Sequence, residues 1–347
     1  MAVDGKTLGF KIAAVTLSVL ATLALLEVAA RLFGPDYQRF NNNSALYFSN
    51  PRGYHTALGR IDGHTVYGIP YSATEDGFRL PEGTPPGTPL PDADYDILGL
   101  GDSFTFGKGV YHQDIYLTRV ERMFRQAGRD VRIRNCGRVG GGQREMYLTY
   151  RRESREDGGY PVVVYGFVLN DFGLPEKYDI VGADLIDQNN GGYSYNPVRD
   201  HSALANLVGH ALDTIRLHRT TIKAYQEAFR PEHAKTRFTL FDHTVKEIRA
   251  DGRELVVLLF PLLYDFDDYP FHRAHAVVRE FCENRDVPFL DLLPAYSRYE
   301  AEELWANPTD HHPNELAHEI AARELFAFLR EQGLPPEQED WAEGLAE

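Results

Sequence analysis

Residues 95–110 read "YDILGLGDSFTFGKGV", and this stretch indicates the fold of the whole chain. Its apolar run ends at Leu100 and is followed at once by Gly101, Asp102 and Ser103. A buried strand that ends on a hydroxyl is typical of a strand-to-helix turn. The serine of such a turn either caps the helix or is presented to a cleft as a nucleophile. The choice depends on which other residues the fold brings to the same place.

Strand-like and helix-like segments alternate along the rest of the chain. The strand-like segments are 95–100, 130–135, 161–169, 254–260 and 287–292, and apolar residues at helical spacing occupy 112–127, 142–155, 239–250, 271–284 and 313–331. Strands that are apolar almost throughout predict a parallel sheet covered on both faces. Because crossover connections are right-handed, we expect a three-layer α/β/α fold with a central parallel sheet.

Polar or glycine-rich segments stand where the strands of this sheet should end. They are Gly101–Ser103, "NCGRVGGG" at 135–142, Asn170–Asp171 and, before the last helical segment, "DHHPN" at 310–314. Chemistry in an open parallel sheet takes place in the crevice beyond the carboxyl ends of the strands. The fold should therefore gather these four segments at one edge of the sheet.

Together the four segments contain what acyl transfer by a serine requires. The hydroxyl of Ser103 becomes a nucleophile only when a base takes its proton, and His312 can be that base. Asp310 lies two residues earlier, on the same side of an extended lead-in, where it can hold the imidazole tautomer. Pro313 favours that extended lead-in and suits the first turn of a helix.

The developing oxyanion also needs preorganised hydrogen-bond donors. The backbone N–H groups of Ser103 and Gly140 can serve, and the amide of Asn170 can add a third donor. A glycine at position 140 lets the backbone approach a substrate without a Cβ in the way.

These segments resemble the signature blocks of a known enzyme family. "GDSFTFG", "NCGRVGGG", "LNDF" and "DHHPN" look like the four blocks of the SGNH (GDSL) hydrolases, in the expected order over about residues 94–332. "DGFRLPE" at 76–82 resembles a segment found ahead of those blocks in membrane-anchored members. Val168 stands where the third block usually has glycine.

The resemblance implies a flavodoxin-like sheet and a site of five residues. Ser103 would be the nucleophile, Asp310 and His312 would complete the triad, and Gly140 and Asn170 would be oxyanion donors with the Ser103 N–H.

The N-terminal segment 1–34 is expected to be a signal anchor. The stretch "IAAVTLSVLATLALL" from Ile12 to Leu26 has no charge, and the apolar segment reaches Ala30 with Glu27 near its outer end. As a helix it would be about 28 Å long, close to the thickness of a bilayer core. Lys6 and Lys11 precede it, which predicts a cytoplasmic N-terminus and a periplasmic or extracellular catalytic domain. A cleaved signal peptide is the alternative.

Other boundaries follow from composition. Residues 35–93 should be irregular, with a small hairpin in "HTVYGIPY" (64–71) and a proline-rich linker that begins at residue 81. The hydrolase domain is expected over 94–332. Its insertion, 172–235, contains a helical segment at 205–229 and is either a lid or a decoration. Residues 333–347 form an acidic tail.

Charge and composition exclude several classes of function. The chain of 347 residues has a net charge of −15 and no Lys/Arg cluster, so we expect no nucleic-acid partner. No phosphate-binding loop and no recognised zinc pattern is present, so no cofactor and no metal are expected. Cys136 and Cys282 are too few for a disulfide framework and are either paired with each other or buried as thiols.

The sequence as a whole predicts a membrane-anchored serine esterase or acyl transferase. Its substrate would be an ester-linked acyl group, above all an O-acetyl group of a cell-surface carbohydrate. A lipase or lysophospholipase that acts on membrane lipids is one alternative. A catalytically silent SGNH-like protein that binds glycan is another, against which the intact Ser103, Asp310 and His312 argue.

Overall fold

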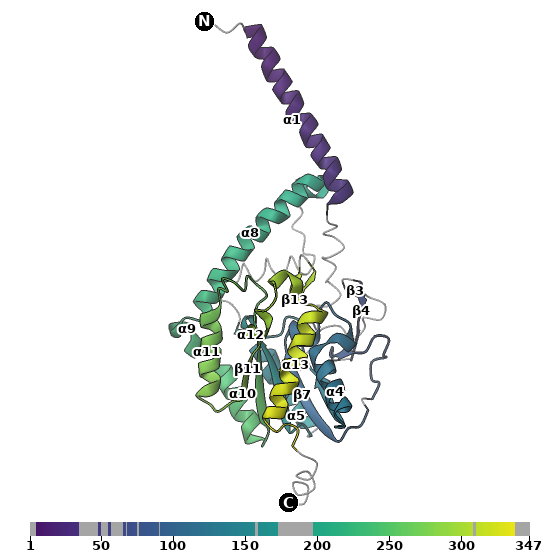
Figure 1. The fold of residues 1–347 in the computed structure, drawn as a ribbon, viewed down its shortest axis with the longest axis vertical. Coiled ribbons are helices and arrows are strands. Elements are labelled where there is room, and N and C mark those ends of the chain that lie inside the picture. The colour runs from purple at the N-terminus through teal and green to yellow at the C-terminus, as the bar shows by residue number, and fades with distance from the viewer. Residues whose placement is uncertain are drawn as a thin grey trace, which may run out of the picture.

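The computed structural model describes residues 5–34, 48–49, 55–56, 65–66, 68–74, 76–89, 91–156, 159–172, 197–307 and 310–336. A body of sheet and helices forms one end of the molecule, and a long N-terminal helix projects from the other (Figure 1).

A five-stranded parallel sheet is the centre of the body. Its strands are β7 (Tyr95–Gly101), β8 (Val131–Asn135), β9 (Val162–Val168), β10 (Glu254–Phe260) and β11 (Phe289–Asp291). They lie in the order β11-β10-β9-β7-β8, and every pair is parallel. Counted along the chain this is 2-1-3-4-5, the flavodoxin-like order. The predicted fold class is thereby confirmed, and β7 is an inner strand whose carboxyl end lies at the switch point.

Helices stand at nearly the positions that the apolar spacing predicts, and these are α4 (Tyr116–Gln126), α5 (Gln143–Glu156), α8 (Ala203–Ala228), α10 (Thr239–Ala250), α11 (His272–Glu283) and α13 (Glu315–Glu331). The other α-helices of the described residues are α1 (Gly5–Phe33), α3 (Ser103–Phe106), α7 (Pro197–His201), α9 (Pro231–Arg237) and α12 (Leu293–Tyr296). Single 3-10 turns are η2 (His112–Asp114), η3 (Leu169–Phe172) and η5 (Ala301–Leu304).

Short antiparallel pairs make up the remaining strands. They are β1 (Phe48–Ser49) with β2 (His55–Thr56), β3 (Thr65–Val66) with β4 (Ile69–Pro70), β5 (Ser72–Ala73) with β6 (Arg79–Leu80), and β12 (Trp305–Asn307) with β13 (Asp310–Pro313). The β3–β4 pair is the small hairpin predicted within 64–71.

Alternate residues of the central strands face opposite layers. Val163, Tyr165 and Phe167 of β9 pack in the layer that contains α5, α10 and α11. Val162 and Val164 pack instead in the layer that contains α4 and α13. This period of two explains why the strands are apolar throughout, since both faces of the sheet are covered.

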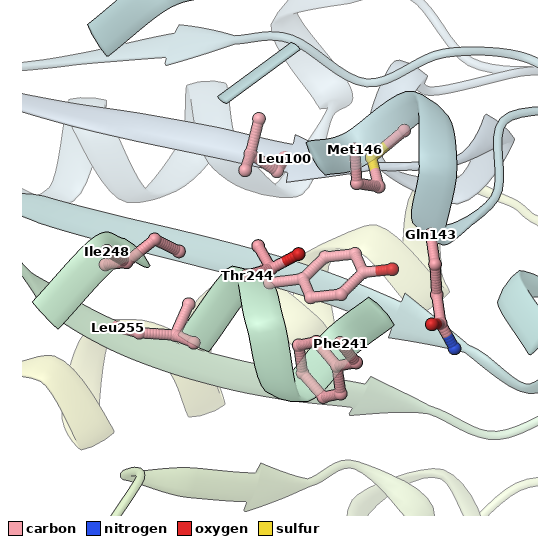
Figure 2. A pocket seen from close by; sticks show the side chains of 8 residues that line it. Leu100, Gln143, Met146, Phe241, Thr244, Ile248 and Leu255 are labelled. Carbon is pink, nitrogen blue, oxygen red and sulfur yellow. The ribbon is translucent and has the colours of Figure 1, made fainter. Parts of the chain in front are cut away.

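A small apolar cavity lies between the sheet and helices α5 and α10 (Figure 2). Its lining consists of Leu100, Gln143, Met146, Tyr165, Phe241, Thr244, Ile248 and Leu255. Its volume is about 10 Å³, which is room for one water at most. The cavity is therefore a packing defect of the core and offers no space for a substrate.

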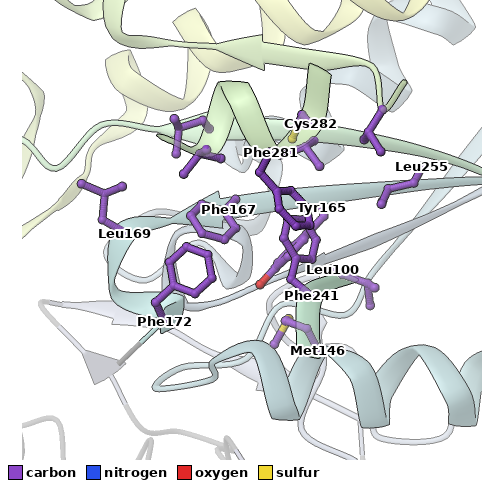
Figure 3. Packing of buried hydrophobic residues seen from close by; sticks show 14 of the residues in the cluster. Leu100, Met146, Tyr165, Phe167, Leu169, Phe172, Phe241, Leu255, Phe281 and Cys282 are labelled. Carbon is purple, nitrogen blue, oxygen red and sulfur yellow. The ribbon is translucent and has the colours of Figure 1, made fainter. Parts of the chain in front are cut away.

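Aromatic rings fill the layer on the same face of the sheet (Figure 3). Phe281 of α11 stacks on Phe238 and on Phe241, with ring centroids 4.4 and 5.0 Å apart. Phe241 in turn stacks on Phe167 of β9 at 5.7 Å. These stacked rings join α10 and α11 to the sheet. Cys136 and Cys282 are both buried, free thiols in this core.

Part of the segment ahead of the sheet packs directly on the body. Tyr71 stacks on Phe106 of α3 at 5.8 Å, and its hydroxyl accepts a hydrogen bond of 2.7 Å from the Gly109 N–H. The guanidinium of Arg79 lies 3.8 Å from the centre of the Tyr71 ring and donates to the Val110 carbonyl. This part of the predicted N-terminal segment therefore supports the turn that follows β7.

The insertion contains one long helix that links two parts of the molecule. The C-terminal part of α8, with Ala224, Tyr225 and Ala228, is buried in the body. Its N-terminal part runs away from the body and contacts the C-terminal end of α1 (Figure 1). Residues 173–196 lie outside the described residues, so the lid remains a prediction.

Gly137 allows the loop after β8 to touch the turn after β7. A Cβ at Gly137 would lie 2.3 Å from the Phe106 nitrogen and 2.6 Å from the Thr105 carbonyl carbon, both backbone atoms that cannot move aside. We expect Gly137→Ala to lower the free energy of unfolding by about 1–3 kcal/mol. A Cβ at Gly142, in the same loop, would come no closer than 3.2 Å to Asp171. Denaturant unfolding of both variants should show a clearly smaller loss for Gly142→Ala, and equal losses would contradict this packing.

Candidate active site

The turn after β7 presents Ser103 as the first residue of α3. Asp102 is the N-cap of this short helix, and its Oδ1 accepts a hydrogen bond of 2.9 Å from the Phe104 N–H. Gly107 ends the helix in the left-handed conformation, with φ of 80°. Because Asp102 provides the cap, the Ser103 hydroxyl is not needed as one. Ser103 is 5% exposed.

His312 lies directly against this hydroxyl. Nε2 of His312 and Oγ of Ser103 are 2.7 Å apart, although 209 residues separate them in the sequence. The ring of Phe104 packs against the imidazole at 5.3 Å between centroids. His312 belongs to β13, and Asn314 caps the following helix α13 by accepting from the Leu316 N–H. A strand followed at once by a capped helix thus fixes the position of the imidazole.

Asp310 occupies the first position of β13, two residues before His312. Its backbone follows the extended path that the sequence predicts, while its side chain lies outside the described part of the structure. The orienting role of Asp310 therefore remains a prediction.

The glycine-rich loop after β8 continues along the end of β7. The Arg138 N–H donates to the Gly101 carbonyl at 2.8 Å. Asn135 pins the loop to the nucleophile turn, because its Nδ2 donates to the Thr105 carbonyl at 2.8 Å and its Oδ1 accepts from the Gly137 N–H at 2.9 Å. Gly140, with φ of 71°, lies exposed at the tip of this loop. A positive φ of this size favours glycine.

Asn170 lies at the end of β9, in the 3-10 turn η3. Its Nδ2 donates a hydrogen bond of 2.9 Å to Oδ2 of Asp102, the residue next to Ser103. Asn170 is exposed while Asp102 is fully buried. The structure therefore brings Ser103, His312 and Asn170 to one edge of the sheet, with the Gly140 loop beside them.

Two buried carboxyl groups lie beneath the site. Burial raises the pKa of Asp102, while the hydrogen bonds from Asn170 and the Phe104 N–H favour its ionised form. Burial and repulsion by Asp102 raise the pKa of Asp171 well above its ordinary value. Asp171 accepts from the Tyr165 hydroxyl and the Val168 N–H at 3.1 Å each.

The neighbouring histidine, His311, is turned to a different environment. Its ring stacks on Trp305 at 3.8 Å with an interplanar angle of 7°. The Trp305 indole N–H donates to the Leu263 carbonyl at 2.9 Å, which holds the pair in place. Adjacent residues of a strand point to opposite sides, so only His312 reaches Ser103.

A third histidine of this region, His318, is a core residue. It is fully buried in α13, and its Nδ1 accepts from the Tyr116 N–H at 3.3 Å. Among the residues that the structure describes, no group of three or more His, Cys, Asp or Glu side chains is placed to hold a metal ion.

The buried His318 should make the protein sensitive to acid. Burial, aided by the nearby Arg119, lowers the pKa of His318 from 6.5 to about 3. Below pH 6.5 the unfolded chain binds a proton that the folded protein refuses, so stability falls as the pH falls towards 3. We expect the wild type to lose about 2 kcal/mol more than His318→Gln between pH 7 and pH 5. Urea unfolding at both pH values tests this, and parallel losses in the two proteins would contradict it.

The sequence did not predict the contacts that support the site. It placed Asp102 in the turn after the first strand of the sheet, but did not indicate that Asp102 accepts a hydrogen bond from Asn170. Asn135 and Asp171 were not expected to have a role in positioning these groups. A signal existed in each case, because each residue is a polar side chain within a predicted site segment at the end of a strand.

Comparison with known proteins finds similar structures only. No family model and no curated protein sequence matches the chain. A crystal structure of TesA is 12% identical and has a TM-score of 0.43, and the match covers 68% of this chain and 98% of that one. The acetyl xylan esterase AlAXEase is 12% identical with a TM-score of 0.44, covering 67% and 98%. A member of the lipolytic protein G-D-S-L family from Veillonella parvula DSM 2008 is 12% identical with a TM-score of 0.39, covering 67% and 97%.

Proposed function

We propose that this protein is a serine-dependent ester hydrolase or acyl transferase of the SGNH type. The observation that carries the proposal is the distance of 2.7 Å between Ser103 Oγ and His312 Nε2 at the carboxyl edge of the sheet. A hydroxyl and an imidazole in this relation form a nucleophile with its base.

The reaction begins when Ser103 Oγ attacks the carbonyl carbon of the ester. The hydroxyl proton passes to His312 Nε2 as the new C–O bond forms. The tetrahedral intermediate then expels the alcohol, which takes that proton from His312, and the acyl group remains on Ser103. A water, or a hydroxyl of an acceptor, attacks the acyl-serine with His312 as base. Collapse of the second intermediate returns the proton to Ser103 and releases the acyl product.

Three groups would stabilise the oxyanion of both intermediates. Two are the backbone N–H groups of Ser103 and Gly140. The third is the Asn170 amide, which has two N–H bonds. One of them donates to Asp102, and the other would donate to the oxyanion. The hydrogen bond to Asp102 thus serves to orient the donor before the substrate arrives.

Removal of the Asn170 amide should impair the chemical step. We expect Asn170→Ala to lower kcat for a nitrophenyl ester by about 10² to 10³-fold, because one preorganised donor is lost. KM should change little, since the donor acts mainly on the developing charge. Asn284→Ala, at the exposed end of α11, is the matched control. A rise in KM with kcat unchanged would contradict this role for Asn170.

The enzyme would be held at a membrane by α1. Gly9–Phe33 is apolar enough to cross a bilayer, and none of it is buried within the protein. A membrane anchor and a signal sequence share these properties, and we propose the anchor. Lys6 ahead of this span and Lys11 near its start would place the catalytic body on the periplasmic or extracellular side.

A short acyl group, above all O-acetyl on a cell-surface carbohydrate, is the proposed substrate. This proposal rests on the expected export of the catalytic body and on the resemblance to the SGNH hydrolases. On this proposal, we expect purified protein to hydrolyse nitrophenyl acetate faster than nitrophenyl esters of long-chain acids. A preference for long chains would favour a lipase instead. Analysis of surface glycans from cells with wild-type or Ser103→Ala protein would then identify the acceptor.

A further inference from the structure

The C-terminal end of α1 is joined to the N-terminus of α8 by the carboxylate of Glu27. Glu27 accepts hydrogen bonds from the Ser202 hydroxyl at 2.8 Å and from the Ala203 and Leu204 N–H groups at 3.0 Å each. The first N–H groups of a helix have no partner within the helix, and its N-terminus favours negative charge. Glu27 therefore caps a helix that begins 176 residues later in the chain.

Arg31 completes the junction. It donates to Glu27 at 2.7 Å and to the carbonyl of His201 at 2.8 Å. The two charged side chains at the end of an apolar helix are thus engaged with each other and with the backbone of the α7–α8 corner. The junction fixes α8 to α1 at a defined height along α1.

The junction lies within the apolar span Gly9–Phe33 of α1. Glu27 precedes Phe33, the last residue of the segment, by about 9 Å of helix axis. The whole segment is about 38 Å long, and a bilayer core is about 30 Å thick. Even if all of the excess length lay on the outer side, Glu27 would remain at the boundary of the core. The first turns of α8 must then cross the headgroup layer.

The exposed surface of these turns suits such a position. Val208, Leu212 and Ile215 are 49%, 61% and 52% exposed. Because they stand at helical spacing, they form one apolar stripe along α8. In a chain of net charge −15, residues 203–219 at the start of α8 contain two arginines and one acidic residue. Apolar residues combined with local positive charge favour an anionic lipid surface.

We propose that the N-terminal half of α8 is a second membrane-contact surface, with its stripe in the outer headgroup layer. This inference rests on the proposed anchoring by α1. Figure 1 shows that α8 runs from the C-terminal end of α1 to the body, so α8 would lead from the bilayer to the body. Since its C-terminal part is buried in that body, α8 would set the distance between the membrane and the active site.

Depth-dependent fluorescence of the full-length protein in nanodiscs tests this contact. The nanodiscs contain phosphatidylcholine and phosphatidylglycerol, with or without lipids that carry a nitroxide near the headgroup. A polarity-sensitive dye is attached to Val208→Cys, and to Lys223→Cys at the exposed far part of α8 as the matched control. Leu20→Cys, exposed on α1, reports the anchor separately with a nitroxide placed deep in the acyl chain. The native cysteines are buried, and the unmodified protein gives their background.

We expect a blue-shifted, nitroxide-quenched signal from position 208, a water-like signal from position 223, and deep quenching at position 20. A water-like, unquenched signal at 208 with deep quenching at 20 would overturn the α8 contact and leave the anchor standing. A blue shift at 208 without quenching by lipid would also overturn it, because a protein surface would then cover the stripe. Absence of quenching at 20 would overturn the anchor, and the α8 contact with it.

Discussion

Replacing Ser103 with alanine should lower kcat for a nitrophenyl ester by about 10⁴-fold or more, because no acyl-enzyme can form. The hydroxyl is the only part of the residue that is removed. Asp102 still caps α3, and Phe104 still packs on His312. We therefore expect thermal unfolding of the variant to be close to that of the wild type.

Ser297→Ala provides a control for the loss of a serine as such. Its hydroxyl donates to the Leu293 carbonyl at 2.7 Å, at the C-terminal end of α12. This variant should retain activity within a few-fold of the wild type. Undiminished hydrolysis by Ser103→Ala would show that another group is the nucleophile.

His312→Ala should cause a loss of similar size, about 10⁴-fold or more in kcat, since the base that takes the serine proton is removed. The chain contains its own control in the adjacent histidine. His311 stacks on Trp305, and His311→Ala should change kcat by no more than a few-fold. Steady-state kinetics of the two variants side by side would separate general-base catalysis from an effect of any histidine in this strand.

The double variant should be no slower than either single one. Ser103 and His312 act as one unit, so the second substitution has nothing left to remove. Losses that multiply would mean that His312 acts independently of the serine, which would contradict the mechanism.

Much of the fold could be predicted because it follows from local periodicity. In β9 the alternation of Val163, Tyr165 and Phe167 with Val162 and Val164 requires cover on both faces, and that requirement defines a parallel sheet. Because crossover connections are right-handed, only a few orders of the strands are then possible. Helix α10 begins and ends where the apolar spacing of residues 239–250 does.

The pairing of Ser103 with His312 could be predicted because the sheet edge collects the ends of its strands. The hydrogen bond from Asn170 to Asp102 could not, because it depends on which rotamers two side chains adopt when β7 and β9 lie side by side. The hydrogen bonds of Glu27 could not be predicted either, because in the sequence Glu27 is a single acidic residue in an apolar segment. Its partners on α8 lie more than 170 residues away, and no local pattern indicates them.

The most direct test of the account is covalent labelling of the full-length protein with a fluorophosphonate, followed by peptide mass spectrometry. Such a probe reacts with a serine whose hydroxyl is activated by a base. We predict one adduct, on Ser103, which is absent in Ser103→Ala and forms far more slowly in His312→Ala. A folded protein that carries no adduct on Ser103, or carries one on a different residue, would contradict the proposed active site.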